Sequence, residues 1–220
     1  MNIVIANSQD WFVPSERLLA LREPFVIGSK EELTESYLEE LEPEYVFFPH
    51  WNWIVPTNIH TQFRCVVFHT APLPYGRGGS PIQNLIMRGF ESAPVSAIQM
   101  SDELDAGPIY CQRTISLGGT LTEIFGRIND KVNELMMEMI LSNPEPIAQC
   151  GTPTTFKRIP EAQNHLPLDG TLETVYDRIR MLDHPSYPSA KIRHGDFILE
   201  FSEAVPGLKE LKTMCRIRKC

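Results

Sequence analysis

The sequence lacks any apolar run long enough to cross a membrane. Its longest apolar stretches, such as Glu44 to His50 and Cys65 to Phe68, are far shorter than the roughly 20 residues of a spanning helix. The opening Met-Asn-Ile-Val-Ile-Ala has neither the basic start nor the long apolar stretch of a signal peptide, and it is typical of a strand. We therefore expect a cytoplasmic protein that has no membrane partner.

Cysteine is scarce, and positive charge is in the minority. The five cysteines are odd in number and include no C-x-x-C pair, which argues against a disulfide framework and against a zinc site. The formal net charge of −8 opposes general nucleic-acid binding, which needs a cationic surface to neutralise phosphates. Only the tail from Lys209 to Lys219 is locally basic. Neither a metal ion nor a nucleic-acid partner is therefore expected.

The remaining composition is that of an ordinary globular protein. Hydrophobic residues make up 42% of the 220 positions and charged residues 22%, so neither a disordered nor a fibrous protein is indicated. This length accommodates one full α/β domain with a small appendage, whereas two full-sized domains would be crowded.

Short runs rich in Val, Ile and Phe alternate with helix-type runs through the first 140 residues, the pattern of βαβ units. We expect strands at Asn2–Ala6, Pro24–Ile27, Tyr45–Phe48, Arg64–Phe68, Val95–Met100 and Ile109–Ile115. We expect helices at Ser15–Leu21, Lys30–Leu41, Ser80–Arg88 and from Thr120, with Glu123 in a capping box, to about Leu141. The prediction is an α/β fold with a Rossmann-like, mostly parallel sheet and helices on both faces.

A change of composition marks the end of this domain. Residues 143–167 are rich in Pro, Gln, Asn and Thr and are predicted to be a linker between a catalytic domain, 1–142, and a small α+β appendage, 168–220. The appendage is expected to contain a helix at Leu172–Leu182 and strands at Ala190–Arg193, Phe197–Phe201 and Leu211–Ile217. Short exposed strand edges invite pairing, so we expect a homodimer through the C-terminal strands.

Two segments that follow expected strands carry the polar chemistry. A loop rich in proline and glycine begins at His69 and reads His-Thr-Ala-Pro-Leu-Pro-Tyr-Gly-Arg-Gly-Gly-Ser-Pro-Ile-Gln-Asn, ending at Asn84. A later turn contains Asp105 in the sequence Leu-Asp-Ala-Gly-Pro-Ile. Because ligands of open α/β sheets gather beyond the carboxyl ends of strands, we expect His69 and Asp105 to share one site.

These two motifs together resemble the folate-dependent formyltransferase family. That family includes methionyl-tRNA formyltransferase, glycinamide ribonucleotide formyltransferase, formyltetrahydrofolate hydrolase and the sugar-nucleotide N-formyltransferases. In much of it the loop reads N-x-H-P-S-L-L-P-x-x-R-G-x-x-P-I and a later motif reads L-D-x-G-x-I. The loop motif is matched here at His69, Leu73, Pro74, Arg77, Gly78, Pro81 and Ile82. Asp105 follows His69 by 36 residues (105 − 69), the spacing expected of the family.

The resemblance implies transfer of a formyl group from 10-formyltetrahydrofolate to an amine, without a metal or a nicotinamide. His69 would stabilise the tetrahedral intermediate and take part in proton transfer, and Asp105 would orient and charge the site. Folate contacts are expected from Leu73, Pro74, Leu104 and Gly107. Contacts with the acceptor substrate are expected from Arg77, Gly78 and Asn84.

One position departs from the family pattern. The catalytic Asn, two residues before the His, is replaced by Val67, whose side chain cannot donate a hydrogen bond. Either another group supplies the oxyanion contact, or the chain is a weakened or inactive relative. We predict that His50, directly after the third expected strand, takes this catalytic role, with Asn52 and Asn84 as alternatives. The other explanation of His50 is packing against its aromatic neighbours.

The acceptor is predicted from length, charge and the C-terminal segment. The family's tRNA enzymes carry a full C-terminal domain after a basic linker, whereas this chain is acidic and stops at Cys220. In glycinamide ribonucleotide formyltransferase, the purine-pathway member of the family, a glycine-rich segment near the N-terminus binds phosphate. No such segment follows Ala6 in this sequence. The segment from Val175 to Asp183 is similar to the start of the appendage in the sugar-nucleotide enzymes. We therefore favour a nucleotide-linked amino sugar as the small-molecule partner.

Three alternatives remain open from the sequence. They are a methionyl-tRNA formyltransferase-like enzyme, a hydrolase of 10-formyltetrahydrofolate, and a non-catalytic binder of folate or a sugar nucleotide. Only Val67 favours the non-catalytic binder.

Overall fold

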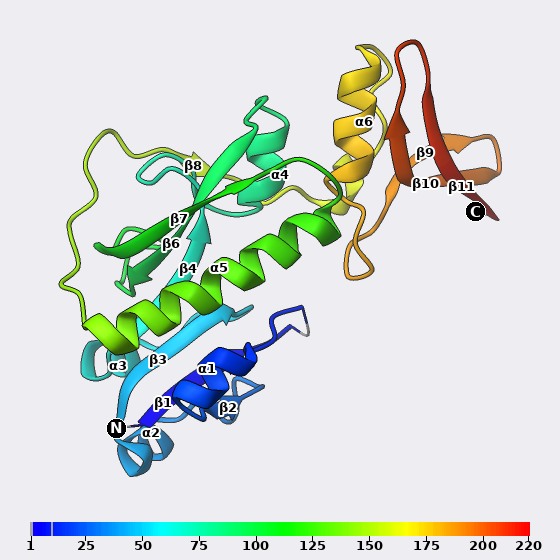
Figure 1. Cartoon of the computed structure of the whole chain (residues 1–220). Coiled ribbons are helices and arrows are strands. Elements are labelled where there is room, and N and C mark those ends of the chain that lie inside the picture. Colours follow the sequence, from blue (N-terminus) through cyan, green and yellow to red (C-terminus); the bar gives the residue numbers. More distant parts are fainter. Residues whose placement is uncertain (1, 10) are drawn as a thin grey trace.

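A six-stranded sheet organises the larger part of the molecule. The computed structural model describes residues 2–9 and 11–220, and Figure 1 shows their arrangement. The strand order is β2-β1-β3-β4-β6-β7. The bounds are β1 Asn2–Asn7, β2 Phe25–Ile27, β3 Pro43–His50, β4 Cys65–Thr70, β6 Ser92–Gln99 and β7 Ile109–Ser116.

Four of these strands, from β2 to β4, are mutually parallel, and β6 is antiparallel to both β4 and β7. The turn between β6 and β7 is too short for the crossover that a parallel pair requires, so these two strands form a hairpin. The sheet is therefore mostly parallel, as the sequence predicts.

Helices cover both faces of the sheet, because alternate residues of the central strands are apolar on both sides. In β1, for example, Ile3 and Ile5 face a larger core and Val4 and Ala6 face a smaller one. The larger core packs against α1 Glu16–Leu21, α4 Pro81–Ile86 and α5 Leu121–Ser142. The smaller core packs against α2 Glu35–Leu41 and α3 Thr57–Gln62.

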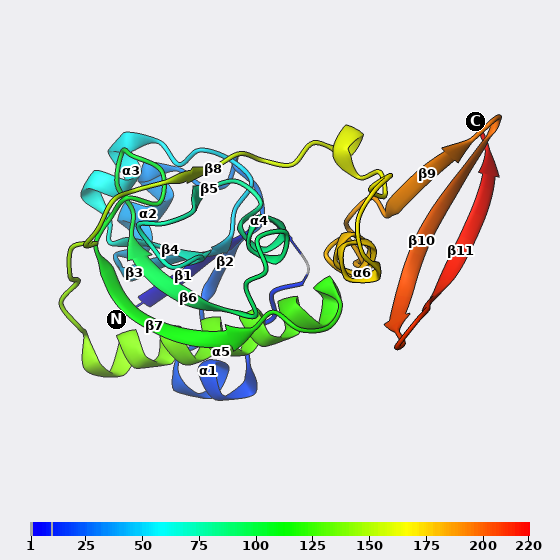
Figure 2. The ribbon, with the colours of Figure 1, turned by 90° about the horizontal axis from the view of Figure 1, so that it is seen from above.

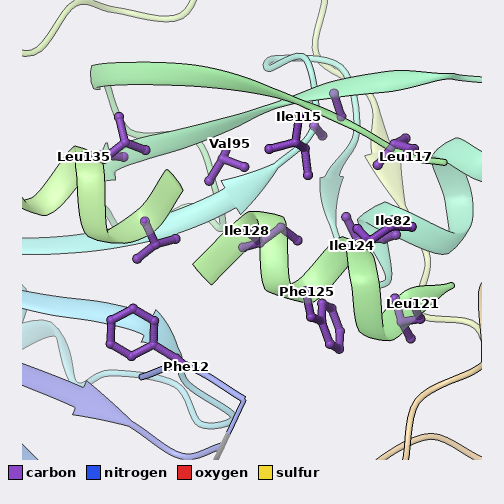
Figure 3. Close-up of a cluster of buried hydrophobic side chains, with 14 of the residues drawn as sticks. Phe12, Ile82, Val95, Ile115, Leu117, Leu121, Ile124, Phe125, Ile128 and Leu135 are labelled. Atoms are coloured by element: carbon purple, nitrogen blue, oxygen red, sulfur yellow. The ribbon is translucent and has the colours of Figure 1, made fainter. Parts of the chain in front are cut away.

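The long helix α5 forms as the sequence predicts. Thr120 caps it, and the Glu123 side chain returns to the Thr120 backbone in the expected capping box. Figure 3 shows α5 side chains, among them Leu121, Ile124 and Ile128, gathered with side chains of the sheet. In contrast, the helix expected from Lys30 begins only at Glu35, where Thr34 accepts a hydrogen bond from the Tyr37 backbone.

The segment 143–167 packs along the sheet domain. Ile147 forms a bridge with Ile109, and β8 Thr155–Phe156 pairs in parallel with β5 Arg77–Gly78. Phe156 is buried in the larger core, and a short 3-10 helix, Glu161–Gln163, follows. The role of this segment as a domain linker stays a prediction, but its contacts with β5 bring it beside the loop that follows His69.

The C-terminal appendage is a three-stranded antiparallel sheet with one helix against it. The sheet order is β11-β10-β9, and Figure 2 shows α6 between this sheet and the larger domain. The bounds are α6 Leu172–Arg180, β9 Ala190–His194, β10 Phe197–Pro206 and β11 Leu211–Lys219.

Arg180 connects the appendage to the sheet domain. Its buried guanidinium donates hydrogen bonds to the carbonyl oxygens of Leu117 and Gly119 and pairs with Asp177 at 2.7 Å. The following residues Met181 and Leu182 belong to the larger core. The first helix of the appendage is thus fastened to the end of β7. In the part of the chain that the structure describes, no helix is both long and apolar enough to cross a membrane.

Candidate active site

His69 lies near the end of β4, between two acceptor groups. The side chain is 6% exposed; its Nε2 is 2.8 Å from the Gly76 carbonyl oxygen, and its Nδ1 is 3.3 Å from Oδ2 of Asp105. A carbonyl oxygen can only accept, so Nε2 carries a hydrogen in this arrangement. If Nδ1 also carries a hydrogen, the ring can donate to both the Gly76 carbonyl oxygen and the Asp105 carboxylate. If it does not, the lone pair of Nδ1 faces the carboxylate. The His69–Asp105 geometry thus allows one proton to be shared between Nδ1 and Oδ2.

Asp105 reaches His69 by a route that the sequence did not predict. Because β6 is antiparallel to β4, the carboxyl ends of these two strands lie at opposite edges of the sheet. The turn from β6 to β7 therefore folds back over the sheet to bring Asp105 to His69. Asp105 has a left-handed backbone with φ of 53°, which costs of order 1–3 kcal/mol for a non-glycine residue. Its Oδ2 accepts a 2.9 Å hydrogen bond from the Gly78 N–H. The surrounding structure therefore holds this carboxylate in place against backbone strain.

Two glycines of the predicted site have backbone reasons to be glycine. Gly78 has φ of 97°, and a Cβ there would lie 2.7 Å from the Phe156 carbonyl oxygen. A Cβ at Gly107 would overlap the Gln99 carbonyl oxygen. Both residues thus permit close approach of main chains around Asp105. The acceptor contact predicted for Gly78 and the folate contact predicted for Gly107 stay predictions.

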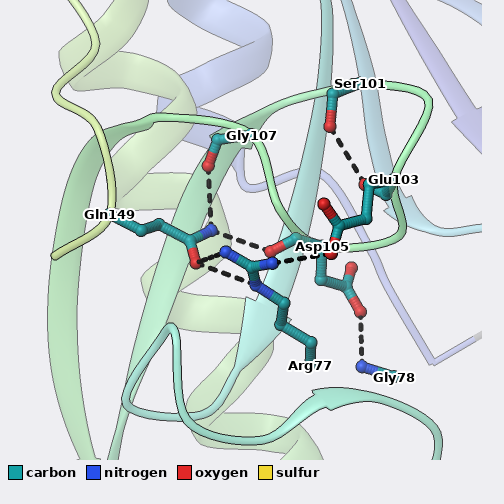
Figure 4. Close-up of polar contacts among 7 residues, drawn as sticks. All are labelled: Arg77, Gly78, Ser101, Glu103, Asp105, Gly107 and Gln149. Carbon is teal, nitrogen blue, oxygen red and sulfur yellow. Dashed lines mark hydrogen bonds and ion pairs between the residues drawn. The ribbon is translucent and has the colours of Figure 1, made fainter. Parts of the chain in front are cut away.

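Arg77 belongs to a network that ties three segments together (Figure 4). Its Nε and Nη2 donate to Oε1 of Gln149 at 3.1 and 2.9 Å, and its Nη1 pairs with Glu103 at 2.9 Å. Gln149 in turn donates to the carbonyl oxygens of Asp105 at 2.8 Å and Gly107 at 2.9 Å. The structure thus gives Arg77 partners within the protein, and its predicted contact with the acceptor stays a prediction.

The remaining predicted binding residues differ in their exposure. Leu104 is 69% exposed beside Asp105, and its predicted contact with folate stays a prediction. Leu73 is half-buried and Pro74 is buried in the loop after β4. Asn84 is buried, and its amide donates to Gly79, Ser80 and Lys157 carbonyl oxygens and accepts from Arg88. These bonds help to pack the loop, and the predicted contact of Asn84 with the acceptor stays a prediction.

His50 and His69 start from opposite faces of the sheet. In the pairing of β1 with β3, Ile5 lies opposite Phe47 and Asn7 lies opposite His50. Asn7 is two residues after Ile5, but His50 is three residues after Phe47, so β3 has one extra residue, a β-bulge. The bulge places the His50 side chain on the same face of the sheet as Phe47. There its ring makes an edge contact with Trp11 at 5.2 Å. His69 shares the other face with Val67, which packs against the smaller core.

The environment of His50 keeps its imidazole neutral at neutral pH. Burial lowers the pKa of His50 below its ordinary value, against a hydrogen bond with Asn52 that raises it, and nearby Arg158 lowers it further. A neutral imidazole can donate from one nitrogen. Within residues 2–9 and 11–220, no hydrogen bond joins His50 to His69 or Asp105. Its predicted oxyanion role stays a prediction.

No group of three or more His, Cys, Asp or Glu side chains suited to a metal ion occurs among the described residues.

Comparison with known proteins places this site in a family. A family model described as Formyl transferase matches residues 23–142, which contain both His69 and Asp105. The chain belongs to the formyl transferase family. A second model, described as Methionyl-tRNA formyltransferase, C-terminal domain, matches residues 161–218.

Relatives and solved structures agree with this family. A methionyl-tRNA formyltransferase of Bacillus mycoides is 31% identical over 170 residues, which cover 73% of this chain and 54% of the relative. The chain thus spans about half the length of the curated relatives it matches. The solved methionyl-tRNA formyltransferase from Clostridium thermocellum has a TM-score of 0.95 at 38% identity, with 100% of both chains covered.

A sugar N-formyltransferase from Shewanella sp FDAARGOS_354 has the same fold. Its TM-score is 0.70 at 19% identity, and the match covers 95% of this chain and 99% of that one.

Proposed function

We propose that this protein transfers a formyl group from 10-formyltetrahydrofolate to a primary amine. The observation that carries the proposal is the His69–Asp105 pair, with Nδ1 and Oδ2 3.3 Å apart beside the exposed Leu104. Membership of the formyl transferase family supports the same reaction. A cytoplasmic location is part of the proposal.

The reaction needs a group that accepts and returns a proton. The acceptor amine attacks the formyl carbon, a C–N bond forms and the carbonyl oxygen becomes an oxyanion. The attacking nitrogen then loses a proton, the bond to N10 of the folate breaks, and N10 takes up a proton as it leaves. The His69–Asp105 pair suits this relay, which contributes roughly 10²- to 10⁴-fold in rate. A donor facing the oxyanion adds about 10² to 10³.

The acceptor we propose is a nucleotide-linked amino sugar. Residues 1–167, which contain the site, carry 11 Lys and Arg against 20 Asp and Glu, a formal charge of −9. Such a surface disfavours a polyanion the size of tRNA more than it disfavours a small ligand. The sugar N-formyltransferase from Shewanella has this fold at 19% identity.

Methionyl-tRNA is the second candidate, and specific observations favour it. The C-terminal family model and the Clostridium thermocellum protein both carry that name. In addition, residues 168–220 carry 9 basic against 8 acidic residues, so the appendage is less acidic than the sheet domain.

A panel of acceptors tests the proposal. The protein would be incubated with 10-formyltetrahydrofolate and either nucleotide-linked amino-dideoxy sugars or methionine-charged initiator tRNA, and kcat/KM would be compared. We expect a sugar nucleotide to have the larger value. A larger value for the charged tRNA would replace the sugar acceptor but keep formyl transfer.

His50→Ala should lower turnover by about 10² if His50 faces the oxyanion, while acceptor KM changes little, because such a contact forms mainly in the transition state. His50→Gln, which keeps a donor, should retain more activity. Steady-state kinetics of the three proteins measure this difference. Normal turnover of His50→Ala would leave His50 only its packing on Trp11.

The proposed homodimer uses β11, the outer strand of the C-terminal sheet, on which Met214 and Ile217 are exposed. Ile217→Asp should give a monomer in sedimentation velocity, and Leu141→Asp, at a comparably exposed position at the end of α5, should not. A wild-type monomer, or a dimer that Ile217→Asp leaves intact, would contradict this interface.

A further inference from the structure

Gln149 uses every hydrogen-bonding position of its side-chain amide. Both N–H groups donate, to the carbonyl oxygens of Asp105 and Gly107, and Oε1 accepts from Nε and Nη2 of Arg77. The partners are distant in sequence, 42 to 72 residues away. An amide is the only common side-chain group that can donate twice and accept twice at one end. This position therefore requires Gln specifically, although it lies in an irregular segment.

These contacts hold both partners of one functional hydrogen bond. Gln149 donates a hydrogen bond to the carbonyl oxygen of Asp105. The side chain of the same Asp105 accepts a hydrogen bond, through Oδ2, from the Gly78 N–H. It also binds Arg77, the residue immediately before Gly78. Figure 4 shows dashed lines from the Gln149 amide to the Arg77 guanidinium and to the carbonyl oxygens of Asp105 and Gly107.

We propose that Gln149 is a positioning residue that holds the Asp105 carboxylate against His69. This inference rests on the proposed function, in which the His69–Asp105 pair moves the proton. Without the Gln149 donors, the carbonyl oxygens of Asp105 and Gly107 lose these hydrogen bonds, and the turn that sets the distance between Oδ2 and Nδ1 is less firmly held. Segment 143–167 is then part of the reacting centre rather than only a connection to the appendage.

Gln149→Glu is the informative variant. It preserves size and the acceptor for Arg77 but places an oxygen against two carbonyl oxygens. We expect turnover to fall about 10- to 10²-fold, as misplaced catalytic groups do, while the KM for the folate donor changes by less than about twofold. Gln163→Glu makes the same chemical change at an exposed position and should remain within about twofold of the wild type.

The decisive comparison is made in the Asp105→Asn background. If Gln149 acts through the carboxylate, Gln149→Glu costs less than about threefold there, because coupled residues are not additive. The full 10- to 10²-fold loss in both backgrounds would overturn the proposal. Should Gln149→Glu fail to fold, Gln149→Met, which removes the donors without adding charge, carries the same test.

A second measurement needs no turnover. The ¹⁵N signals of the His69 imidazole report its contact with Asp105 in the resting protein, and Gln149→Glu should move them in the same direction as Asp105→Asn. Unchanged His69 signals would overturn the proposal. Moved signals in a protein that forms no formyl product would sustain the positioning role and reject the proposed function, so the two failures are distinguishable.

Discussion

Asp105→Asn is expected to fold normally and to turn over at least about 10²-fold more slowly than the wild type. Asn keeps the size of the side chain, and its carbonyl oxygen can still accept from the Gly78 N–H. It removes the negative charge that faces Nδ1 of His69 at 3.3 Å, so the proposed proton transfer loses its carboxylate. His69→Asn, which removes the imidazole itself, should lose a similar factor.

Thermal unfolding measures whether Asp105→Asn folds normally, and single-turnover formyl transfer measures its loss of rate. Asp102→Asn is the matched control, since Asp102 lies in the same turn but pairs with His60 and is largely exposed. It should remain within about twofold of the wild type. A near-wild-type rate for Asp105→Asn would remove the carboxylate from the chemistry.

Gly107→Ala should impair both stability and turnover. The added Cβ would overlap the Gln99 carbonyl oxygen, and a backbone oxygen in β6 cannot move aside as a flexible side chain can. Either β6 or the turn must shift, which we expect to cost about 1–3 kcal/mol of unfolding free energy. Because Asp105 lies two residues before Gly107, the same shift should lower turnover by about 10².

Urea unfolding and turnover test Gly107→Ala against Gly126→Ala. Gly126 lies within α5 with open space at its Cβ position, so alanine there should be neutral or stabilise by up to about 1 kcal/mol. If Gly107→Ala were as stable and active as the wild type, the packing of the Asp105 turn would not matter as described.

The sequence predicted those parts of the fold in which apolar residues recur with a clear helix or strand period. The apolar stripe of α5 and its Thr120 cap, for instance, are as predicted. The six-residue helix α3, Thr57–Gln62, was not predicted, because it follows Pro56 without a side-chain cap. The two-residue strands β5 and β8 are likewise too short to leave a pattern, and they form through tertiary contact.

The candidate site was predictable only where a local motif carries it. His69 and Asp105 lie within recognisable motifs, and the structure brings their side chains together. The bulge that turns His50 toward Trp11 depends on pairing with β1, which no local pattern of β3 reveals. Gln149 was missed for the same reason, since Asp105 is 44 residues away and Arg77 is 72.

The measurement that tests formyl transfer most directly follows a labelled formyl group. With 10-formyltetrahydrofolate labelled at the formyl carbon, the account predicts tetrahydrofolate release that depends on an amine acceptor, with the label recovered in a formamide and lost in Asp105→Asn. Equal release without acceptor, with the label in formate, would identify a hydrolase instead. Binding of the donor without any release would leave a non-catalytic protein and contradict the account.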